Sequence, residues 1–133
     1  MRTSGPQISE KMLHVKTQID KVQLKTNEAM IYSIFENLIE NAIKYTPERG
    51  QIFISLQSEK GQLVFSVSDN GPGLTEIQKE RIFDRFYRVD ESRSEVKGTG
   101  LGLAIVEKNV QELHGTIDVV SILGKGTTFT VKL

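Results

Sequence analysis

The chain has 133 residues, of which 38% are hydrophobic and 26% are charged, and it contains no cysteine. This length and composition suit one globular domain, and the lack of cysteine excludes disulfide bonds and thiolate metal sites. Lysine and arginine total 17, as do aspartate and glutamate, so no net positive charge favours nucleic acid or an anionic membrane, and no apolar run approaches the ~20 residues that cross a bilayer.

The N-terminal part of the chain gives weak signals. Residues 1–6 contain no apolar stretch and are interpreted as an artificial leader. Apolar side chains recur at helix-like spacing over residues 8–19, which predicts a weak helix, and residues 21–26 alternate as a short strand does. We therefore divide the chain into a leader and N-terminal segment at 1–20 and a domain at 21–133.

A strong amphipathic helix is predicted from Asn27 to about Tyr45. Asn27 suits an N-cap, and the acidic Glu28 suits the first turn. Apolar residues recur on one face of the segment that follows. The helix should stop at Thr46-Pro47, because proline cannot continue it and restricts the residue before it.

The rest of the chain predicts two hairpins separated by a second helix. Residues 52–56 and 63–67 alternate around Lys60-Gly61, and residues 116–121 and 127–133 alternate around Gly124-Lys125-Gly126. Between the hairpins, residues 101–113 form an amphipathic pattern that closes at His114-Gly115. This order predicts the α+β class, a two-layer sandwich in which helices cover one face of a mostly antiparallel, mixed sheet.

A dense run of charge lies between the first hairpin and the second helix. Residues 76–97 carry twelve charged residues, six of each sign, which predicts a solvated segment with little core. Ile82, Phe83 and Phe86 are large apolar residues within this run. They are either a hydrophobic latch that docks a lid or a short buried helix face.

Asn37 and Asn41 are four residues apart and share one face of the first helix, with Lys44 and Tyr45 continuing toward its end. Amides placed in this way have two possible roles. They can cap a neighbouring loop, or they can offer hard oxygen ligands to a magnesium ion that also holds phosphates. The spacing alone favours capping, and Lys44 alone suits the helix dipole.

Asp69 ends an apolar strand and is followed by Gly71 and Gly73. A carboxylate held there can accept a hydrogen bond from an exocyclic amine such as that of adenine, and the glycines allow close backbone approach to a ligand. A plain β-turn with aspartate at its first position explains the same residues, and taken alone it is the better interpretation.

Three alternating glycines precede the second helix in Gly98-Thr99-Gly100-Leu101-Gly102-Leu103. Free backbone N–H groups at a helix start favour an anion, whereas a flexible hinge explains only the first glycine. No strand is predicted before this segment, so a dinucleotide-binding βαβ unit is rejected, and the lysine of a Walker loop is missing. The glycines at 124 and 126 are explained by the hairpin turn.

In this order the segments resemble the sequence boxes of sensor histidine kinases. Residues 37–47 resemble the N box, 69–73 the first glycine box, 82–90 the F box, 98–105 the second glycine box and 124–129 the third. The resemblance implies the Bergerat fold, an ATP-binding fold that histidine kinases share with Hsp90, type II topoisomerases and MutL. It also implies that residues 74–99 form an ATP lid.

The resemblance implies a role for each site residue. Asn41 would bind Mg²⁺ and Asn37 would assist at the phosphates, while Lys44 and Arg88 would contact them. Asp69 would bind the adenine amino group, and Tyr45 would flank the ring. The remaining residues expected at the nucleotide are Gly71, Gly73, Tyr87, Gly98, Thr99, Gly100, Leu101, Gly102, Leu103 and Thr128, the last near the adenine end.

Phosphoryl transfer is favoured over hydrolysis by one position. The hydrolysing relatives resemble one another in carrying a glutamate one turn before the magnesium asparagine, and here that position is Asn37, which is no general base at neutral pH. Glu36 and Glu40 do not share the required helix face. His14 lacks the surroundings of a phosphoacceptor histidine, and His114 is expected to close a helix, so the acceptor would lie on another domain.

The resemblance therefore predicts a protein-histidine kinase catalytic domain with ATP and Mg²⁺ as cofactors. Its expected partners are a histidine-containing dimerisation domain of the same kinase and, through it, a response regulator. The fragment is expected to be cytoplasmic and monomeric, without nucleic acid or membrane contact, although the parent protein could be a membrane sensor. The alternative is a nucleotide-gated interaction module that binds ATP without transferring phosphate.

Overall fold

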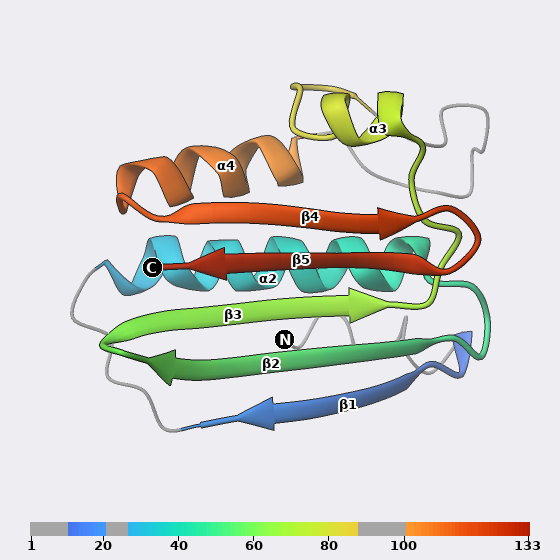
Figure 1. Cartoon of the computed structure of the whole chain (residues 1–133), viewed down its shortest axis with the longest axis horizontal. Coiled ribbons are helices and arrows are strands. Elements are labelled where there is room, and N and C mark those ends of the chain that lie inside the picture. Colours follow the sequence, from blue (N-terminus) through green and yellow to red (C-terminus); the bar gives the residue numbers. More distant parts are fainter. Residues whose placement is uncertain (1–10, 21–26, 88–100) are drawn as a thin grey trace.

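The computed structural model describes residues 11–20, 27–87 and 101–133. Within these ranges, five strands form one sheet in the order β1-β2-β3-β5-β4, and three helices accompany it (Figure 1). β1 runs parallel to β2, while the other neighbouring pairs are antiparallel. The predicted α+β class, with a mostly antiparallel mixed sheet covered on one face by helices, is confirmed.

Helix α2, Glu28–Tyr45, forms as the sequence predicts. The side chain of Asn27 accepts a hydrogen bond from the backbone N–H of Met30 at 3.2 Å, which satisfies one unpaired donor of the first turn. At the other end Thr46 is extended, with ψ at 129°, and its backbone N–H still donates to the carbonyl of Ala42. Pro47 then prevents another helical turn.

The two hairpins also match their predictions. β2, Gln51–Glu59, pairs with β3, Gln62–Asp69, through a two-residue turn in which Lys60 and Gly61 both have positive φ. That backbone twist suits a tight antiparallel hairpin. β4, Thr116–Ile122, and β5, Gly126–Lys132, form the second hairpin, and β5 lies beside β3.

Helix α4, Gly102–Glu112, has Leu113 as its C-cap, and His114 follows in a left-handed conformation. The positive φ lies at His114 rather than at Gly115, whose N–H donates to the carbonyl of Val110. The short helix α3, Glu76–Arg81, lies within the charge-rich segment. None of the helices in the described ranges is both long enough and apolar enough to span a bilayer.

The expectation of a weak helix over residues 8–19 is wrong for its C-terminal half, because β1 is a strand at His14–Ile19. Val15, Thr17 and Ile19 are β-branched and alternate, a pattern that suits a strand beside β2. The sheet thus begins before residue 21, where the sequence places the start of the domain. The strand expected at residues 21–26 lies outside the described residues.

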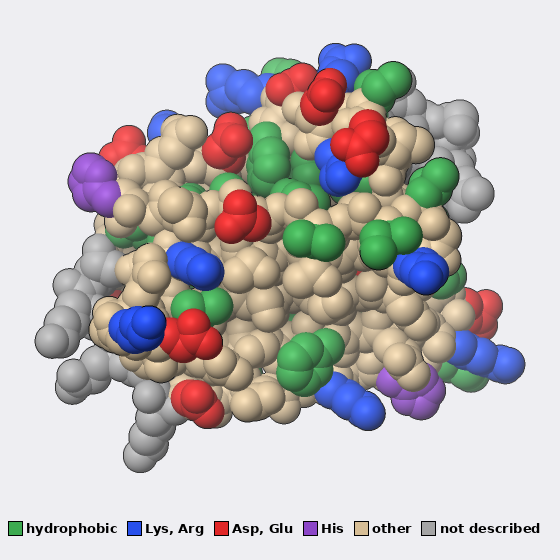
Figure 2. All heavy atoms as spheres, viewed as in Figure 1, with side chains coloured by type: hydrophobic (Ala, Val, Ile, Leu, Met, Phe, Trp, Pro, Cys, Tyr) green, Lys and Arg blue, Asp and Glu red, His purple; other side chains and the backbone are tan. Residues whose placement is uncertain are grey.

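The core fills the space between the helices and one face of the sheet. Ile34 and Leu38 of α2 are fully buried, as is Val106 of α4, and the rings of Phe35 and Phe65 stack with centroids 4.1 Å apart. The opposite face of the sheet is exposed, and Figure 2 shows charges of both signs interspersed there with separate apolar side chains. One face of the sheet is filled by the core and the other carries only scattered side chains. A ligand site is therefore expected at the edge where the helices meet the strand ends.

Candidate functional site

A small cleft lies between α2, the end of β3 and the start of β5. It gathers segments that are far apart in the sequence: the helix predicted to carry the amides, the turn after Asp69, the charge-rich segment, the start of α4 and the last strand. Its walls are formed by Asn41, Tyr45, Asp69, Pro72, Gly73, Leu74, Ile82, Leu103, Thr127 and Phe129.

One wall of the cleft is a face of α2. Asn41 and Tyr45 are one helical turn apart, and both line the cleft near the end of the helix. The sequence placed both residues in the site, and the structure brings them together. Lys44 is adjacent in sequence but does not line the cleft, and its Nζ lies 6.0 Å from the centre of the Tyr45 ring.

Asp69 faces α2 from the end of β3. One carboxylate oxygen accepts a hydrogen bond from the backbone N–H of Gly71 at 2.8 Å, and the backbone of Thr127 also bonds to this carboxylate. Burial raises the pKa of Asp69 above its ordinary value, while these two backbone bonds oppose the rise. The group is therefore a partly desolvated hydrogen-bond acceptor directed into an apolar cleft.

Two glycines bring the loops around Asp69 into close backbone contact. Gly73 has a φ of 74°, and a Cβ on it would lie 2.3 Å from the carbonyl oxygen of Ile122. Gly126 has a φ of 139°, and a Cβ there would lie 2.0 Å from the carbonyl oxygen of Asp69. Side chains at these positions would separate the turn after β3 from the β4–β5 hairpin.

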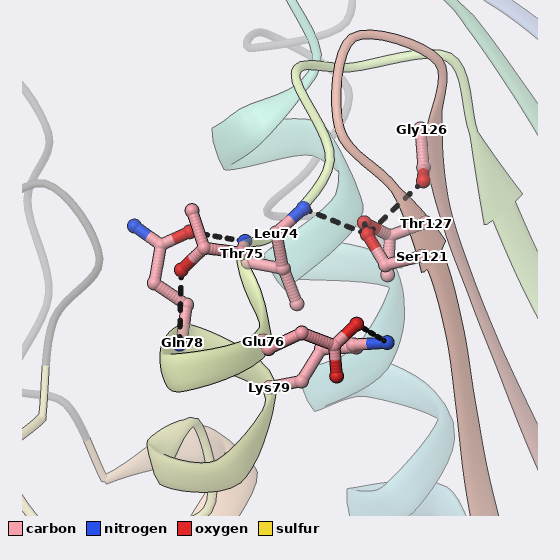
Figure 3. Close-up of polar contacts among 8 residues, drawn as sticks. All are labelled: Leu74, Thr75, Glu76, Gln78, Lys79, Ser121, Gly126 and Thr127. Carbon is pink, nitrogen blue, oxygen red and sulfur yellow. Dashed lines mark hydrogen bonds and ion pairs between the residues drawn. The ribbon is translucent and has the colours of Figure 1, made fainter.

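Ser121 joins the same two loops and was not identified from the sequence. Its hydroxyl accepts a hydrogen bond from the N–H of Leu74 at 2.7 Å and donates to the carbonyl of Gly126 at 3.1 Å (Figure 3). It also lies 2.8 Å from the hydroxyl of Thr127. A serine on the inner face of a strand is a weak signal, because its partners lie in distant segments.

The N-terminal part of the charge-rich segment closes one side of the cleft. Thr75 and Gln78 form a capping box at the start of α3 (Figure 3). Ile82 is buried, and the ring of Phe83 packs edge-on against Phe129. Phe86 instead has a φ of 66° and is 67% exposed, so only two of the three predicted apolar residues pack inward.

The start of α4 approaches the face of α2 that carries Asn37. A Cβ on Gly102 would lie 3.1 Å from the side-chain oxygen of Asn37, whose amide nitrogen donates to the carbonyl of Ser33 at 2.8 Å. Asn37 therefore lies between two helices and does not line the cleft. Within the described residues, Leu101 provides no side-chain cap for the first N–H groups of α4.

Several predicted site residues are placed elsewhere. Thr128 lies on the opposite side of the strand, where its hydroxyl is 2.8 Å from that of Ser68. Because strand side chains alternate, Thr127 lines the cleft instead, and this corrects the prediction by one residue. Tyr87 packs partly buried against the core. The predicted residues Arg88, Gly98, Thr99 and Gly100 lie outside the described residues.

The described side chains suit a magnesium ion that is also bound by phosphate, and not one held by protein ligands alone. Across residues 11–20, 27–87 and 101–133, no group of three or more histidine, cysteine, aspartate or glutamate side chains could hold a metal. Asn41 nonetheless offers a hard amide oxygen at the cleft. Mg²⁺ usually keeps several waters and takes few protein ligands when it also binds phosphates. The donor set therefore fits a magnesium ion that arrives with a phosphate ligand.

Comparisons with known proteins identify a family and several relatives of this chain. The family model described as "Histidine kinase-, DNA gyrase B-, and HSP90-like ATPase" matches residues 26–133. The sensor histidine kinase RppB of Synechocystis sp. is 44% identical over 108 residues, which cover 80% of this chain and 24% of RppB. The phosphate regulon sensor protein PhoR of Pseudomonas aeruginosa is 46% identical over 110 residues, which cover 82% of this chain and 25% of PhoR.

The fold of this chain is also similar to that of a solved structure. Full-length ShkA in complex with AMPPNP has a TM-score of 0.82 at 29% identity, and the match covers 98% of this chain and 27% of that one. The chain thus spans about a quarter of the length of these relatives and of this structure.

Proposed function

Because this chain belongs to the family of histidine kinase-, DNA gyrase B- and HSP90-like ATPases, we propose that it binds Mg-ATP and donates the γ-phosphate to a histidine on a separate domain. Its relatives include a sensor histidine kinase and a phosphate regulon sensor protein. The observation that carries the proposal is that Asp69 and Asn41 line one cleft from facing elements. These residues are far apart in the sequence but line the same cleft, so a single ligand can contact both the carboxylate and the amide.

The nucleotide would lie with adenine at Asp69 and phosphates toward α4. The Asp69 carboxylate would accept a hydrogen bond from the adenine amino group, with Tyr45 flanking the ring and Gly71 and Gly73 allowing close approach. Thr127, which lines the cleft, would take the place expected for Thr128 at this end of the site. Apolar cleft residues such as Leu74, Ile82 and Phe129 suit a planar ring.

The phosphate end would be formed by Asn41, which would hold Mg²⁺, and by the first N–H groups of α4 at Leu101, Gly102 and Leu103. A helix N-terminus favours an anion through its unpaired donors and its dipole. Lys44, Tyr87, Arg88 and Gly98 to Gly100 remain proposed contacts. When bound, Mg²⁺ would neutralise phosphate charge, and catalysis would otherwise consist of positioning and electrostatics.

Transfer rather than hydrolysis is supported by the cleft lining, which has no second carboxylate among the described residues. Asp69 is the sole acidic residue among the described residues that line the cleft. Glu36 lines a separate apolar groove between α2 and the β1 side of the sheet. Asn37 cannot accept a proton from water at neutral pH. We therefore infer slow ATP hydrolysis, with a partner imidazole as the acceptor.

The wider setting is also a proposal. The acceptor histidine would lie on a dimerisation domain of the same kinase, and a response regulator would receive the phosphate from it. The fragment would act in the cytoplasm as a monomer.

The proposal is tested by supplying the acceptor separately. The chain is mixed with radiolabelled ATP, Mg²⁺ and a histidine-containing dimerisation domain, and acid-labile phosphate on that domain is measured. Transfer that Asp69→Asn abolishes supports the kinase. Nucleotide binding without transfer to any such domain would instead indicate an interaction module, and no binding at all would reject both.

A further inference from the structure

The side chain of Lys11 lies against the C-terminal end of α2. Its Nζ donates to the carbonyl oxygens of Ile43 at 2.7 Å, Lys44 at 2.8 Å and Thr46 at 3.2 Å. An ammonium group has three N–H donors, so this arrangement uses all of them. The last carbonyls of a helix lack intrahelical partners and carry partial negative charge, so a cation suits this position.

The backbone that carries Lys11 is held by the loop after α2. The N–H of Arg49 donates to the carbonyl of Lys11 at 2.6 Å, and the N–H of His14 donates to the carbonyl of Gly50 at 2.9 Å. Met12 adopts a φ of 53°, an unfavourable conformation for a residue with a side chain. Lys11 therefore acts on the helix end from a fixed position.

The turn that Lys11 binds is the turn that forms one wall of the cleft. The bonded carbonyls of Lys44 and Thr46 flank Tyr45, and Asn41 lies one turn earlier. On the other side, a Cβ on Gly71 would lie 3.0 Å from the carbonyl oxygen of Tyr45. The end of α2 is thus held between Lys11 and the turn that follows Asp69.

We propose that Lys11 is a positioning residue for the nucleotide: it fixes the last turn of α2 so that Asn41 and Tyr45 face Asp69. This inference rests on the proposed function, since it concerns the same cleft. Lys11 does not line the cleft and would not touch the nucleotide. It acts through the carbonyl groups of the helix end, and it connects the segment that precedes the sheet to the nucleotide site.

The test compares three lysine variants of the full chain by calorimetric titration with AMP-PNP and Mg²⁺. Lys11→Met keeps most of the side-chain length but has no donor, and its Kd should rise by roughly fivefold to tenfold. Lys11→Arg restores donors and should bring the Kd to within about threefold of the original. Lys16→Met is the matched control, because Lys16 is an exposed lysine on β1, and its Kd should not change.

A merely structural role is separated from positioning by a double-mutant cycle. Circular dichroism first establishes that each variant is folded at the titration temperature. Tyr45→Leu is then combined with Lys11→Met. If Lys11 acts through the turn that carries Tyr45, the two losses of affinity should be strongly non-additive. If Lys11→Met is unfolded, the folded Lys11→Gln variant takes its place in the same cycle.

The outcomes are distinct. An original chain that does not bind AMP-PNP rejects the proposed function itself. If the original chain binds, an unchanged Kd in the folded Lys11 variant, or strictly additive effects with Tyr45→Leu, rejects the positioning role and leaves the proposed function standing. A weakened, arginine-rescued and non-additive Kd supports the role of Lys11.

Discussion

The carboxylate of Asp69 accepts a hydrogen bond from the backbone N–H of Gly71 at 2.8 Å, at the point where β3 ends. This bond fixes the turn, and a second bond from the backbone of Thr127 helps to hold the carboxylate at the cleft. The same side chain therefore shapes the loop and is proposed to recognise the ligand, and these two roles can be separated by substitution.

Asp69→Asn should weaken ATP-analogue binding by about 10- to 100-fold, because a hydrogen bond to a charged acceptor is lost at a partly buried site. The asparagine oxygen can still accept from the backbone N–H of Gly71, whereas its amide has one acceptor fewer for the backbone of Thr127, so the free energy of unfolding in urea should fall by no more than about 1–3 kcal/mol. Calorimetric titration measures the affinity. Asp118→Asn, an exposed aspartate on β4, is the matched control and should bind as the original chain does.

Nucleotide affinity should fall on mild acidification, starting above the pH at which an ordinary aspartate is protonated. Burial raises the pKa of Asp69 above its ordinary value of 3.8, and the proposed contact needs the ionised form. Acidification should have the opposite effect on folding stability, because protonating Asp69 favours the folded state. A carboxyl with a raised folded-state pKa contributes stability that is present below its unfolded pKa and is lost as the pH rises through its folded pKa.

This pH dependence should disappear in Asp69→Asn. Titrations of both chains with AMP-PNP over a mildly acidic pH series make the comparison. An affinity that declines equally in both would assign the effect to the nucleotide or to another group.

Gly73→Ala should destabilise the fold more than Gly124→Ala. Both glycines have positive φ, so alanine costs about 1 kcal/mol at either position from the backbone alone. A Cβ at Gly73 would also meet the carbonyl oxygen of Ile122 at 2.3 Å, whereas nothing lies within 4 Å of one at Gly124. The clash should add about 1–3 kcal/mol, measured as the difference in unfolding free energy in urea. Equal losses would show that the two loops separate freely.

Ser121→Ala should lower the free energy of unfolding by about 1–3 kcal/mol, because the N–H of Leu74 loses its acceptor in a partly buried place. Nucleotide affinity should fall as well, since Ser121 also holds the hairpin that carries Thr127. Urea unfolding and calorimetric titration measure the two effects. The exposed Ser58 on β2 provides the control, and Ser58→Ala should leave both quantities unchanged.

Asn41→Leu should remove much of the magnesium-dependent part of ATP binding. Asn41 is proposed to supply the amide oxygen to Mg²⁺, so adding EDTA should weaken binding to the original chain far more than binding to the variant. Titrations of ATP with and without the metal give the two ratios. A variant that retains the full effect of Mg²⁺ would place the ion on other ligands.

Local signals were enough for the elements with clear ends. Asn27 and Thr46-Pro47 delimited α2, because a cap and a proline act within one turn of chain. Lys60-Gly61 located the first hairpin for the same reason. β1 was misread as part of a weak helix, since its side chains are mostly exposed and its pairing partner lies in β2.

The sequence by itself determined the α+β class, the helix that carries Asn41 and Tyr45, the turn at Asp69 and the resemblance to sensor histidine kinases. Only the tertiary structure decided that Thr127 rather than Thr128 lines the cleft, and that Ser121 and Lys11 hold its walls. The physical reason is the distance along the chain over which each interaction acts. Caps, turns and helical faces are set by neighbours a few residues away, whereas strand parity and hydrogen bonds to distant backbone groups exist only once the layers have packed.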